Sequence, residues 1–480
     1  MKSFFINAAD KAEKINSAVK CRGAILTALI ICIIAVSLGV PLIKGSDSFS
    51  AVVSAGAFFS VIAVLMLIRR DSIERFSVKK TYGIPIVLTG LLFLFNGLLY
   101  SVAGYIAVGI VFCIIIPFLN LVFYSHSQAA VCRAISRAIM ISFIAFILIC
   151  ILMGAPIGKT QYTGILSNPN TLGNFMIIAV AANIYLICDA YRSRSMHKKN
   201  EQDDCSDNGQ SKSRRENRNI CFLYIPLALA VVVAVYSNSR TSMIAIFMQL
   251  AVVFLMYLIR KIRCHDAGGC VRLAKRALAF LILAFVLFFA MFFVLTDVKV
   301  QIIKALPDIQ ITNEYDNVKL SGMLGRMGAR YTKGLDNSES SGDDDQFTSG
   351  RKEIWKDYIN NIGVLGHEKE GRDIKEELRT YHGANAHNVY LQMAYSAGIP
   401  AGLAMIALMF FTAKDLIKKM YAFIRDGLMD EGLVLTICCA LGFAIVSLTS
   451  GGYMLYTYLP STFFYFSLFT LSIKDKSIRE

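Results

Sequence analysis

The sequence predicts an all-α integral membrane protein with about twelve transmembrane helices, and three observations support this prediction. Of its 480 residues 55% are hydrophobic and only 17% are charged, a balance that is unusual for soluble domains. Nearly uncharged stretches recur along the chain, and about 20 helical residues suffice to cross a hydrocarbon core of roughly 30 Å. Basic residues gather in alternate polar connections, which is typical of a multi-pass membrane protein.

The apolar stretches set the order of the predicted elements. We expect membrane-spanning helices at residues 23–43, 50–68, 83–100, 102–123, 134–153, 171–190, 220–237, 241–259, 277–295, 392–413, 432–449 and 457–473. These spans divide the chain into residues 1–295 with helices one to nine, a large polar loop at 296–391, and residues 392–480 with helices ten to twelve.

The distribution of lysine and arginine predicts the orientation. With the N-terminus inside, the cytoplasmic side receives the basic segments 69–75, 192–218, 260–276, 414–425 and the tail after residue 474. The short segments on the other side hold only Lys44, Lys159 and Arg240. By the positive-inside rule both termini are cytoplasmic and the large loop is extracytoplasmic. Attraction to an anionic inner leaflet explains the net charge of +15, so no nucleic-acid partner is expected.

Two polar insertions interrupt the helices. Residues 191–219 are charged and nearly free of apolar side chains, which predicts a flexible loop. The large loop instead contains a helix signal that begins near Arg351, where apolar residues recur at three- and four-residue steps. They are Ile354, Trp355, Tyr358, Ile359 and Ile362. We therefore expect a short amphipathic helix that lies on the membrane surface or packs on the bundle.

Neither a disulfide nor a metal is expected. All twelve cysteines lie in predicted spans or cytoplasmic segments, away from the large outer loop. Cys264, His265 and Cys270 are three potential ligands, but their spacing fits no standard zinc pattern. We expect no metal and no cofactor.

Three outward segments carry residues that could bind a ligand or take part in catalysis. Arg240 lies between two apolar stretches and is either an anion receptor or a snorkelling residue that marks the boundary. Asn168 and Asn170 flank a proline, and Asn170 could cap the next helix, whose N-terminal amides could face a sugar or phosphate. His387 lies at the start of a span and is either a proton acceptor or a histidine bonded within its loop. His367 and His382 lie in the same loop.

These motifs form a recognisable series. In chain order they are Asn168-Pro169-Asn170, Ser239-Arg240-Thr241, Gly350-Arg351 with Ile354-Trp355, Gly363-Val364-Leu365-Gly366-His367, and His387-Asn388 followed by Gly398. The series resembles the O-antigen ligase and polysaccharide polymerase family of bacterial membrane glycosyltransferases. The resemblance implies a type C glycosyltransferase-like fold in the bacterial inner (cytoplasmic) membrane, with the active site on the extracytoplasmic face.

The resemblance also implies a reaction and roles for residues. A glycan would move from an undecaprenyl diphosphate carrier to an acceptor hydroxyl. Arg240 and Arg351 would bind the diphosphate, His387 would be the catalytic base or orient the acceptor, and Asn388 would hold the loop or the histidine tautomer. Asn168, Asn170 and His367 would support the site. The implied partners are a lipid-linked oligosaccharide donor, a glycan acceptor, membrane lipids and other polysaccharide-assembly membrane proteins, and no metal is required.

The acceptor distinguishes the alternatives. We expect polymerisation of repeat units of a capsule, exopolysaccharide or O-antigen, because Ala401 stands where ligases of the family usually carry Gly, Thr or Tyr. Ligation to a lipid A core or to protein is the near alternative. A polysaccharide transporter or flippase would share the many spans but would be expected to show inverted repeats. Two hypotheses remain. The protein could be a glycosyltransferase of another class with Asp47 as the base, or a purely structural membrane scaffold.

Overall fold

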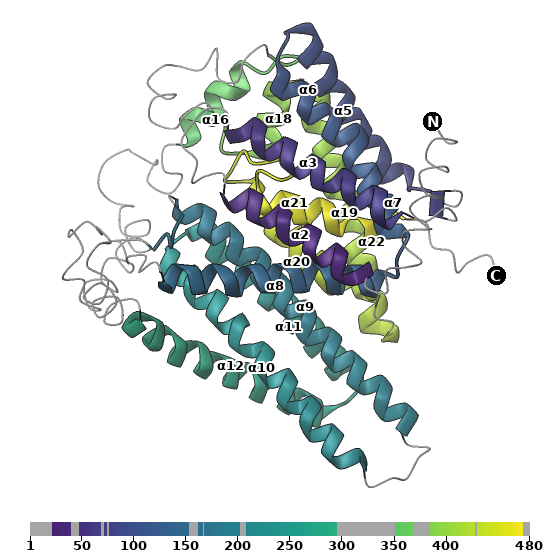
Figure 1. Cartoon of the computed structure of the whole chain (residues 1–480), viewed down its shortest axis with the longest axis vertical. Coiled ribbons are helices and arrows are strands. Elements are labelled where there is room, and N and C mark those ends of the chain that lie inside the picture. Colours follow the sequence, from purple (N-terminus) through teal and green to yellow (C-terminus); the bar gives the residue numbers. More distant parts are fainter. Residues whose placement is uncertain are drawn as a thin grey trace. The chain divides into compact units, whose positions relative to one another are not determined.

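The computed structural model describes the protein as a helical chain. The described residues are 22–39, 48–68, 72–73, 76–152, 162–166, 168–201, 208–294, 351–367, 385–427 and 430–473. Within these ranges the named elements are all helices, and an isolated bridge joins Val78 to Ile473. The prediction of an all-α chain is confirmed for this part of the molecule (Figure 1).

Eight predicted spans are confirmed as helices of sufficient length and apolarity to cross a membrane. They are α5 (Lys80–Leu99), the run Ala103–Tyr124, α8 (Gln128–Leu152), Pro169–Arg194, Ile220–Ser237, α11 (Arg240–Arg263), α12 (Ala267–Phe293) and α19 (Ile399–Asp426). The run Ala103–Tyr124 consists of α6 (Ala103–Ile110), η2 (Val111–Ile115) and α7 (Ile116–Tyr124). The other four predicted spans contain helices too: α2 (Arg22–Gly39), α3 (Ser48–Leu67), α20 (Leu433–Ser447), and α21 (Leu459–Ser467) with α22 (Phe469–Ser472). The number of twelve crossings stays a prediction.

The charged insertion at residues 191–219 differs from the prediction. α9 (Pro169–Glu201) continues past its apolar part, and α10 (Asn208–Ser237) begins well before its own apolar part. The prediction of a flexible loop over the whole insertion is therefore wrong. Lysine, arginine, glutamine and glutamate favour helix, so a helix that leaves the apolar layer can continue as a charged one.

The tenth predicted span begins later than expected. The first residues of the predicted range 392–413 belong to a separate short helix, α18 (Val389–Ala397). Gly398 ends α18 with a φ of 91°, in the region that favours glycine, and Pro400 stands in the first turn of α19. The chain therefore turns at Gly398 instead of running straight through.

The molecule divides into two compact units, and the first comprises residues 1–131, 326–418 and 443–480. In it α5 packs closely against α6 and η2 (Figure 1). Glycines permit this approach: a Cβ on Gly97 would lie 2.6 Å from the Ile106 amide nitrogen, and one on Gly109 would lie 2.7 Å from that of Leu94. Small residues at helix contacts are the usual means of close packing in membranes.

Aromatic side chains form the centre of the first unit. Phe443 stacks on Phe464 with ring centroids 4.5 Å apart, and Phe123 contacts both Phe466 and Phe469. These rings fix α21 and α22 against α7, because aromatic pairs add to the stability that burial alone provides.

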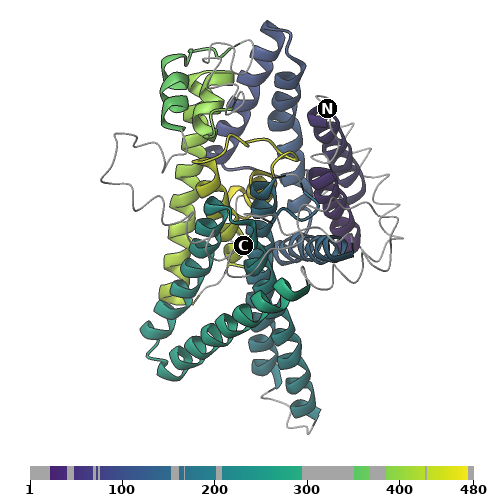
Figure 2. The same ribbon diagram turned by 90° about the vertical axis from the view of Figure 1, so that its left-hand side faces the viewer.

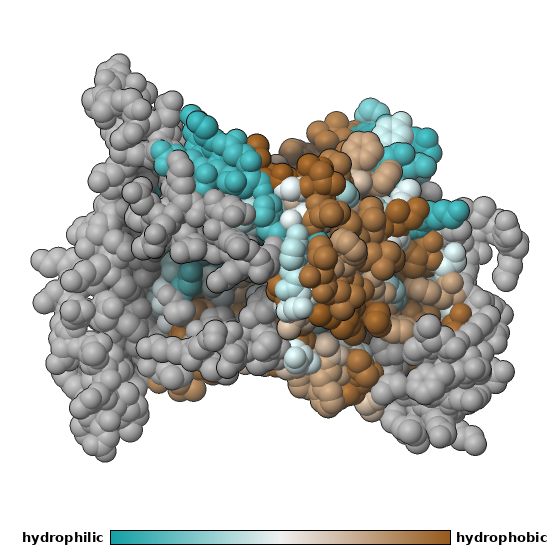
Figure 3. All heavy atoms as spheres, turned by 90° about the horizontal axis from the view of Figure 1, so that it is seen from above, coloured by the Kyte–Doolittle hydropathy of each residue, from teal (hydrophilic) through white to brown (hydrophobic). Residues whose placement is uncertain are grey.

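The second unit comprises residues 132–325 and 419–442. α9 is its central helix, since 83% of the residues in its most apolar stretch are buried, compared with 6% in that of α12. From residue 277 to residue 293 the exposed residues of α12 are apolar, among them Leu281 at 62% and Phe285 at 65% exposure. On the face drawn in Figure 3, apolar side chains cover much of the described surface that is in view. Such a surface suits contact with lipid instead of water.

Candidate functional site

Helix α16 (Arg351–Asn360) packs on α18 in the first unit (Figure 2). Ile354 and Tyr358 are buried, as the apolar periodicity predicts, and they form a cluster with Ala386 and Tyr395. Ile359 belongs to the same predicted face but is 57% exposed. The indole Nε1 of Trp355 donates a hydrogen bond to the Ala386 carbonyl oxygen at 2.9 Å. The helix that begins at Arg351 is thereby attached to the residue directly before His387.

The loop around His387 is held by hydrogen bonds on both sides. The Asn385 Oδ1 accepts from the His387 amide at 2.8 Å, and the Gln392 Oε1 accepts from the Ala386 amide at 2.8 Å. After the turn, the Asn388 Oδ1 caps α18 by accepting from the amides of Tyr390 and Leu391 at 3.0 and 3.1 Å. His387 has a φ of 48°, an uncommon left-handed conformation for a residue other than glycine. This local network defines the position of a half-buried histidine.

Replacing Trp355 by phenylalanine is expected to lower glycan transfer by about ten- to a hundredfold, because small displacements of catalytic groups are costly. The phenyl ring would fill most of the space of the indole, but the bond to the Ala386 carbonyl would be lost. The measurement is the initial rate at matched membrane levels. Ile359→Ala on the same helix is the control and should retain wild-type rate, since Ile359 is exposed. An unchanged Trp355→Phe rate would contradict the role of this bond.

The glycine-containing loop before His367 packs against the turn between α18 and α19. The Ile399 amide donates to the Gly363 carbonyl at 3.2 Å. A Cβ on Gly398 would lie 2.1 Å from the Val364 carbonyl oxygen, and one on Gly366 would lie 2.6 Å from the Ser396 carbonyl oxygen. Both glycines have positive φ angles, 83° at Gly366 and 91° at Gly398. Two sequence motifs that are distant in the chain are therefore in direct contact.

Gly398→Ala is expected to destabilise the folded protein by about 2 kcal/mol or more, because it adds both backbone strain and a contact with the Val364 carbonyl. Thermal unfolding of the detergent-purified protein would measure the change. Gly104→Ala is the control, because a Cβ there meets nothing within 4 Å. Equal unfolding temperatures for the Gly398 variant and wild type would show that this turn does not constrain the fold.

His367 is fixed by Tyr395 of α18. The two rings are parallel within 2° at a centroid distance of 4.0 Å, and the His367 Nδ1 lies 3.0 Å from the Tyr395 carbonyl oxygen. Tyr395 also contacts the Tyr358 ring at 4.8 Å. One tyrosine thus connects the His367 loop, α16 and α18, so His367 is placed to organise the loop.

Arg240 lies in the second unit, at the first residue of α11. The turn before it contains Asn238 at a φ of 50°, followed by Ser239. The Ser239 hydroxyl donates to the Asn170 Oδ1 at 3.0 Å and lies 3.0 Å from the Ser242 hydroxyl. The start of α11 is therefore bonded to the start of α9, and Arg240 is half-buried there.

The cap of α9 differs from the prediction. Asn168, and not Asn170, stands directly before the first helical residue, and its Oδ1 accepts from the Asn170 amide at 2.8 Å. Pro169 is the first residue of the helix, a position that proline favours because no amide hydrogen is needed there. This shift frees the Asn170 side chain for its bond to Ser239.

The predicted site residues thus fall in two groups. Arg351, His367, His387 and Asn388 belong to the first unit, and Arg240, Asn168 and Asn170 to the second. His382 lies outside the described residues, as do Lys44, Asp47 and Lys159. Within each group, hydrogen bonds or ring contacts link the segments that carry the residues.

Comparison with known protein families identifies the segment that carries most of these residues. Residues 225–406 match the family model described as O-antigen ligase. This segment is similar to the O-antigen ligase family. The search of curated proteins finds no match to this chain.

The matched segment, called the domain below, contains residues of both groups. It extends from α10 into α19 and includes Arg240, Arg351, His367, His387 and Asn388. Asn168 and Asn170 precede the matched segment, but Asn170 is bonded to Ser239 inside it. The start of α9 is therefore a structural neighbour of the domain.

Several residues that support the domain were not predicted from sequence. Asn96 of α5 donates from Nδ2 to the Ser396 carbonyl at 2.9 Å, and it is fully buried. An amide side chain in an apolar span is a signal that could have identified it. Tyr395 carries no such signal, because its contacts with Tyr358 and His367 are set by the fold.

Proposed function

We propose that this chain is a membrane glycosyltransferase that extends a surface polysaccharide from undecaprenyl-diphosphate-linked repeat units. The family match supports a glycosyltransferase of the O-antigen ligase and polymerase type. The predicted orientation puts both termini in the cytoplasm, gives the chain about twelve crossings of a bacterial cytoplasmic membrane, and puts His387 on the extracytoplasmic face. The activated donor supplies the energy, so no nucleotide sugar is needed there.

In this proposal the two arginines bind the donor diphosphate. Negative charge develops on the leaving lipid diphosphate as the glycosidic bond breaks, and fixed cations stabilise that charge. A guanidinium can bind two phosphate oxygens in parallel, which also orients the donor. Arg351 and Arg240 would perform this role from the two units, which requires the units to present them to one diphosphate. The reaction proposed here needs no metal.

His387 would accept the proton of the attacking hydroxyl. Histidine gains and loses a proton near neutral pH, which suits a general base. The Asn385 and Asn388 side chains accept hydrogen bonds from backbone amides on both sides of His387, which fixes the backbone that carries the imidazole. The hydrogen bond from Trp355 to the Ala386 carbonyl is the observation that carries the proposal, because it links the Arg351 helix to the His387 loop.

Ligation is the second candidate function, and the similarity of residues 225–406 to the O-antigen ligase family favours it. Against it, Ala401 is fully buried at the start of α19, at the position where ligases of the family usually carry Gly, Thr or Tyr. A polysaccharide transporter would explain the spans. It would not explain why the helix that begins at Arg351 is bonded to the loop that carries His387.

Glycan products in cells would test these alternatives. A deletion strain complemented by wild-type protein should contain long chains on the lipid carrier, and an empty vector should leave single repeat units. Transfer of a finished glycan to a second acceptor in one step would instead identify a ligase. Retention of the lipid-linked unit on the cytoplasmic face in the deletion strain would identify a flippase.

A further inference from the structure

A cavity of about 730 Å³ lies within the second unit, among α9, α10, α11 and α12 and the end of α19. Its volume falls in the range of about 300–1,000 Å³ that is usual for small-molecule sites. Apolar side chains form part of its wall, among them Ile184, Leu227, Leu250 and Val253. None of the proposed catalytic residues lines it, so the cavity is separate from that chemistry.

The polar lining of the cavity is cationic. Its five charged lining residues are Arg192, Arg194, Lys261, Arg272 and Arg276. Among the described residues, no aspartate or glutamate lines it. Cations from α9, α11 and α12 therefore converge on one space, which favours an anionic occupant over a cationic one.

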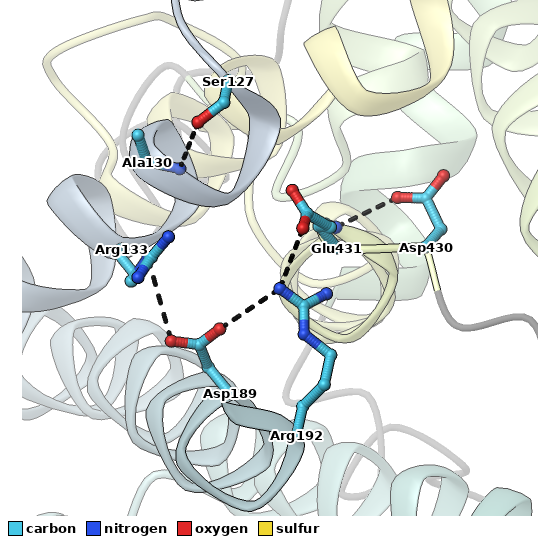
Figure 4. Close-up of polar contacts among 8 residues, drawn as sticks. Ser127, Ala130, Arg133, Asp189, Arg192, Asp430 and Glu431 are labelled. Atoms are coloured by element: carbon cyan, nitrogen blue, oxygen red, sulfur yellow. Dashed lines mark hydrogen bonds and ion pairs between the residues drawn. The ribbon is translucent and has the colours of Figure 1, made fainter. Parts of the chain in front are cut away.

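Nearby carboxylates orient some of these cations from outside the cavity. The Asp189 and Glu431 carboxylates hold the Arg192 guanidinium at 3.5 and 3.0 Å, as Figure 4 shows. Asp189 also lies 3.9 Å from the Arg133 Nε. Asp189 is thus shared by two arginines, and Glu431 is the second carboxylate of this group. The charges of Arg192 and Arg133 are balanced here, so the excess positive charge of the cavity comes from its other cations.

A similar sharing occurs where α11 meets α12. Asp266 lies 2.8 Å from the Lys261 Nζ and 3.6 Å from an Arg272 nitrogen. The hydrogen bond from Lys261 is the main reason that the pKa of Asp266 is lowered, followed by the bond from the Gly269 amide. The Asp266 carboxylate is therefore charged at neutral pH, and even so one carboxylate faces two cations.

Arg276 interacts with an aromatic ring. Its guanidinium carbon lies 4.3 Å from the centre of the Tyr191 ring, and no carboxylate pairs with it among the described residues. A guanidinium stacked in this way keeps its N–H edge available to an anion. Arg260 differs from Arg276. Its side chain donates to the Ile424 and Arg425 carbonyls and so stabilises the end of α19.

We propose that this cavity binds the phosphate headgroup of an anionic phospholipid, with Arg272 and Arg276 as its main contacts. The apolar wall would receive the upper part of an acyl chain. α12 continues from these arginines into an exposed apolar surface, with Leu278 at 59% exposure, so a lipid can reach the cavity from the bilayer. Basic pockets between transmembrane helices on the cytoplasmic side are a known means of binding such headgroups. This inference does not depend on the proposed reaction.

Native mass spectrometry of the purified full-length protein would test the proposal, with phosphatidylglycerol and phosphatidylcholine added in equal amounts. Wild type should bind phosphatidylglycerol preferentially. The double variant Arg272→Gln with Arg276→Gln should lose about tenfold in its apparent affinity for that lipid, because two charge-assisted contacts disappear. Lys275→Gln removes one positive charge from α12 at an exposed residue that does not line the cavity, and it should change the affinity less than about twofold.

Several results would overturn the assignment. Equal binding of the two lipids by wild type would remove the basis for a headgroup site. An equal loss in the Lys275 control would show a general effect of charge. If inorganic phosphate displaced phosphatidylglycerol as effectively as short-chain phosphatidylglycerol did, the cavity would be a site for free phosphate. Unfolding temperatures of the variants, if equal to wild type, exclude misfolding as the cause of any loss.

Discussion

His387→Asn is expected to slow glycan transfer by about a hundred- to ten-thousand-fold, the usual contribution of a general base. Asparagine is chosen because His387 has a φ of 48°, which asparagine tolerates better than alanine. The loop should therefore keep its bonds from Asn385 and Asn388 while the proton acceptor is lost. The rate of undecaprenyl diphosphate release by purified protein, at saturating donor, is the measurement.

A histidine elsewhere in the chain provides a matched control. His265 lies in the turn between α11 and α12 with a φ of 52°, and it is exposed. His265→Asn makes the same chemical change with the same backbone demand, so its rate should equal that of wild type. If His387→Asn also kept wild-type rate with an unchanged unfolding temperature, His387 would be a loop residue and another base would have to be found.

Arg351→Gln is expected to reduce the maximal transfer rate by about a hundred- to a thousandfold, because the leaving diphosphate would lose a fixed cation. Lys352→Gln is the control, since Lys352 is its exposed neighbour in α16. Steady-state kinetics would separate the two effects that an arginine can have. A loss in maximal rate indicates transition-state stabilisation, whereas a rise in KM alone would mean that Arg351 binds donor without promoting the reaction.

Combining this change with Arg240→Gln tests whether residues of the two units act together. If both arginines stabilise the same diphosphate, the double variant should lose less than the product of the two single losses. Independent losses that multiply would indicate that Arg240 acts at a separate anion site near Asn170. This cycle needs only activity measurements and matched membrane levels.

Much of the helical architecture could be predicted from the sequence, because apolar length is a strong signal in a membrane protein. Eight predicted spans are helices of spanning length, and the Ile354 and Tyr358 periodicity correctly predicted a buried face of α16. The errors arose where hydropathy carries no information. The charged ends of α9 and α10 are helical, and α18 is separated from α19 at Gly398 within one apolar stretch.

The candidate site could be predicted in part for the same reason. Arg240 and His387 stand out as polar residues next to apolar spans, and their neighbourhood is visible in the sequence. The partners that position the loop are not visible, since the Trp355 bond to Ala386 and the Tyr395 stack on His367 are tertiary contacts. Asn170 was predicted only as a helix cap, because its bond with Ser239 joins residues that are far apart in the chain.

The most direct test of the central proposal is transfer by purified wild-type protein in vesicles, with a lipid-linked single repeat unit as the only substrate. The proposal predicts a ladder of longer lipid-linked glycans, with one undecaprenyl diphosphate released for each unit added, and no product from His387→Asn. If wild-type protein binds the donor but leaves it intact under these conditions, while releasing lipid diphosphate once a separate acceptor is added, the chain does not polymerise and the ligase assignment replaces it. If the donor stays intact with every acceptor, the glycosyltransferase proposal is contradicted.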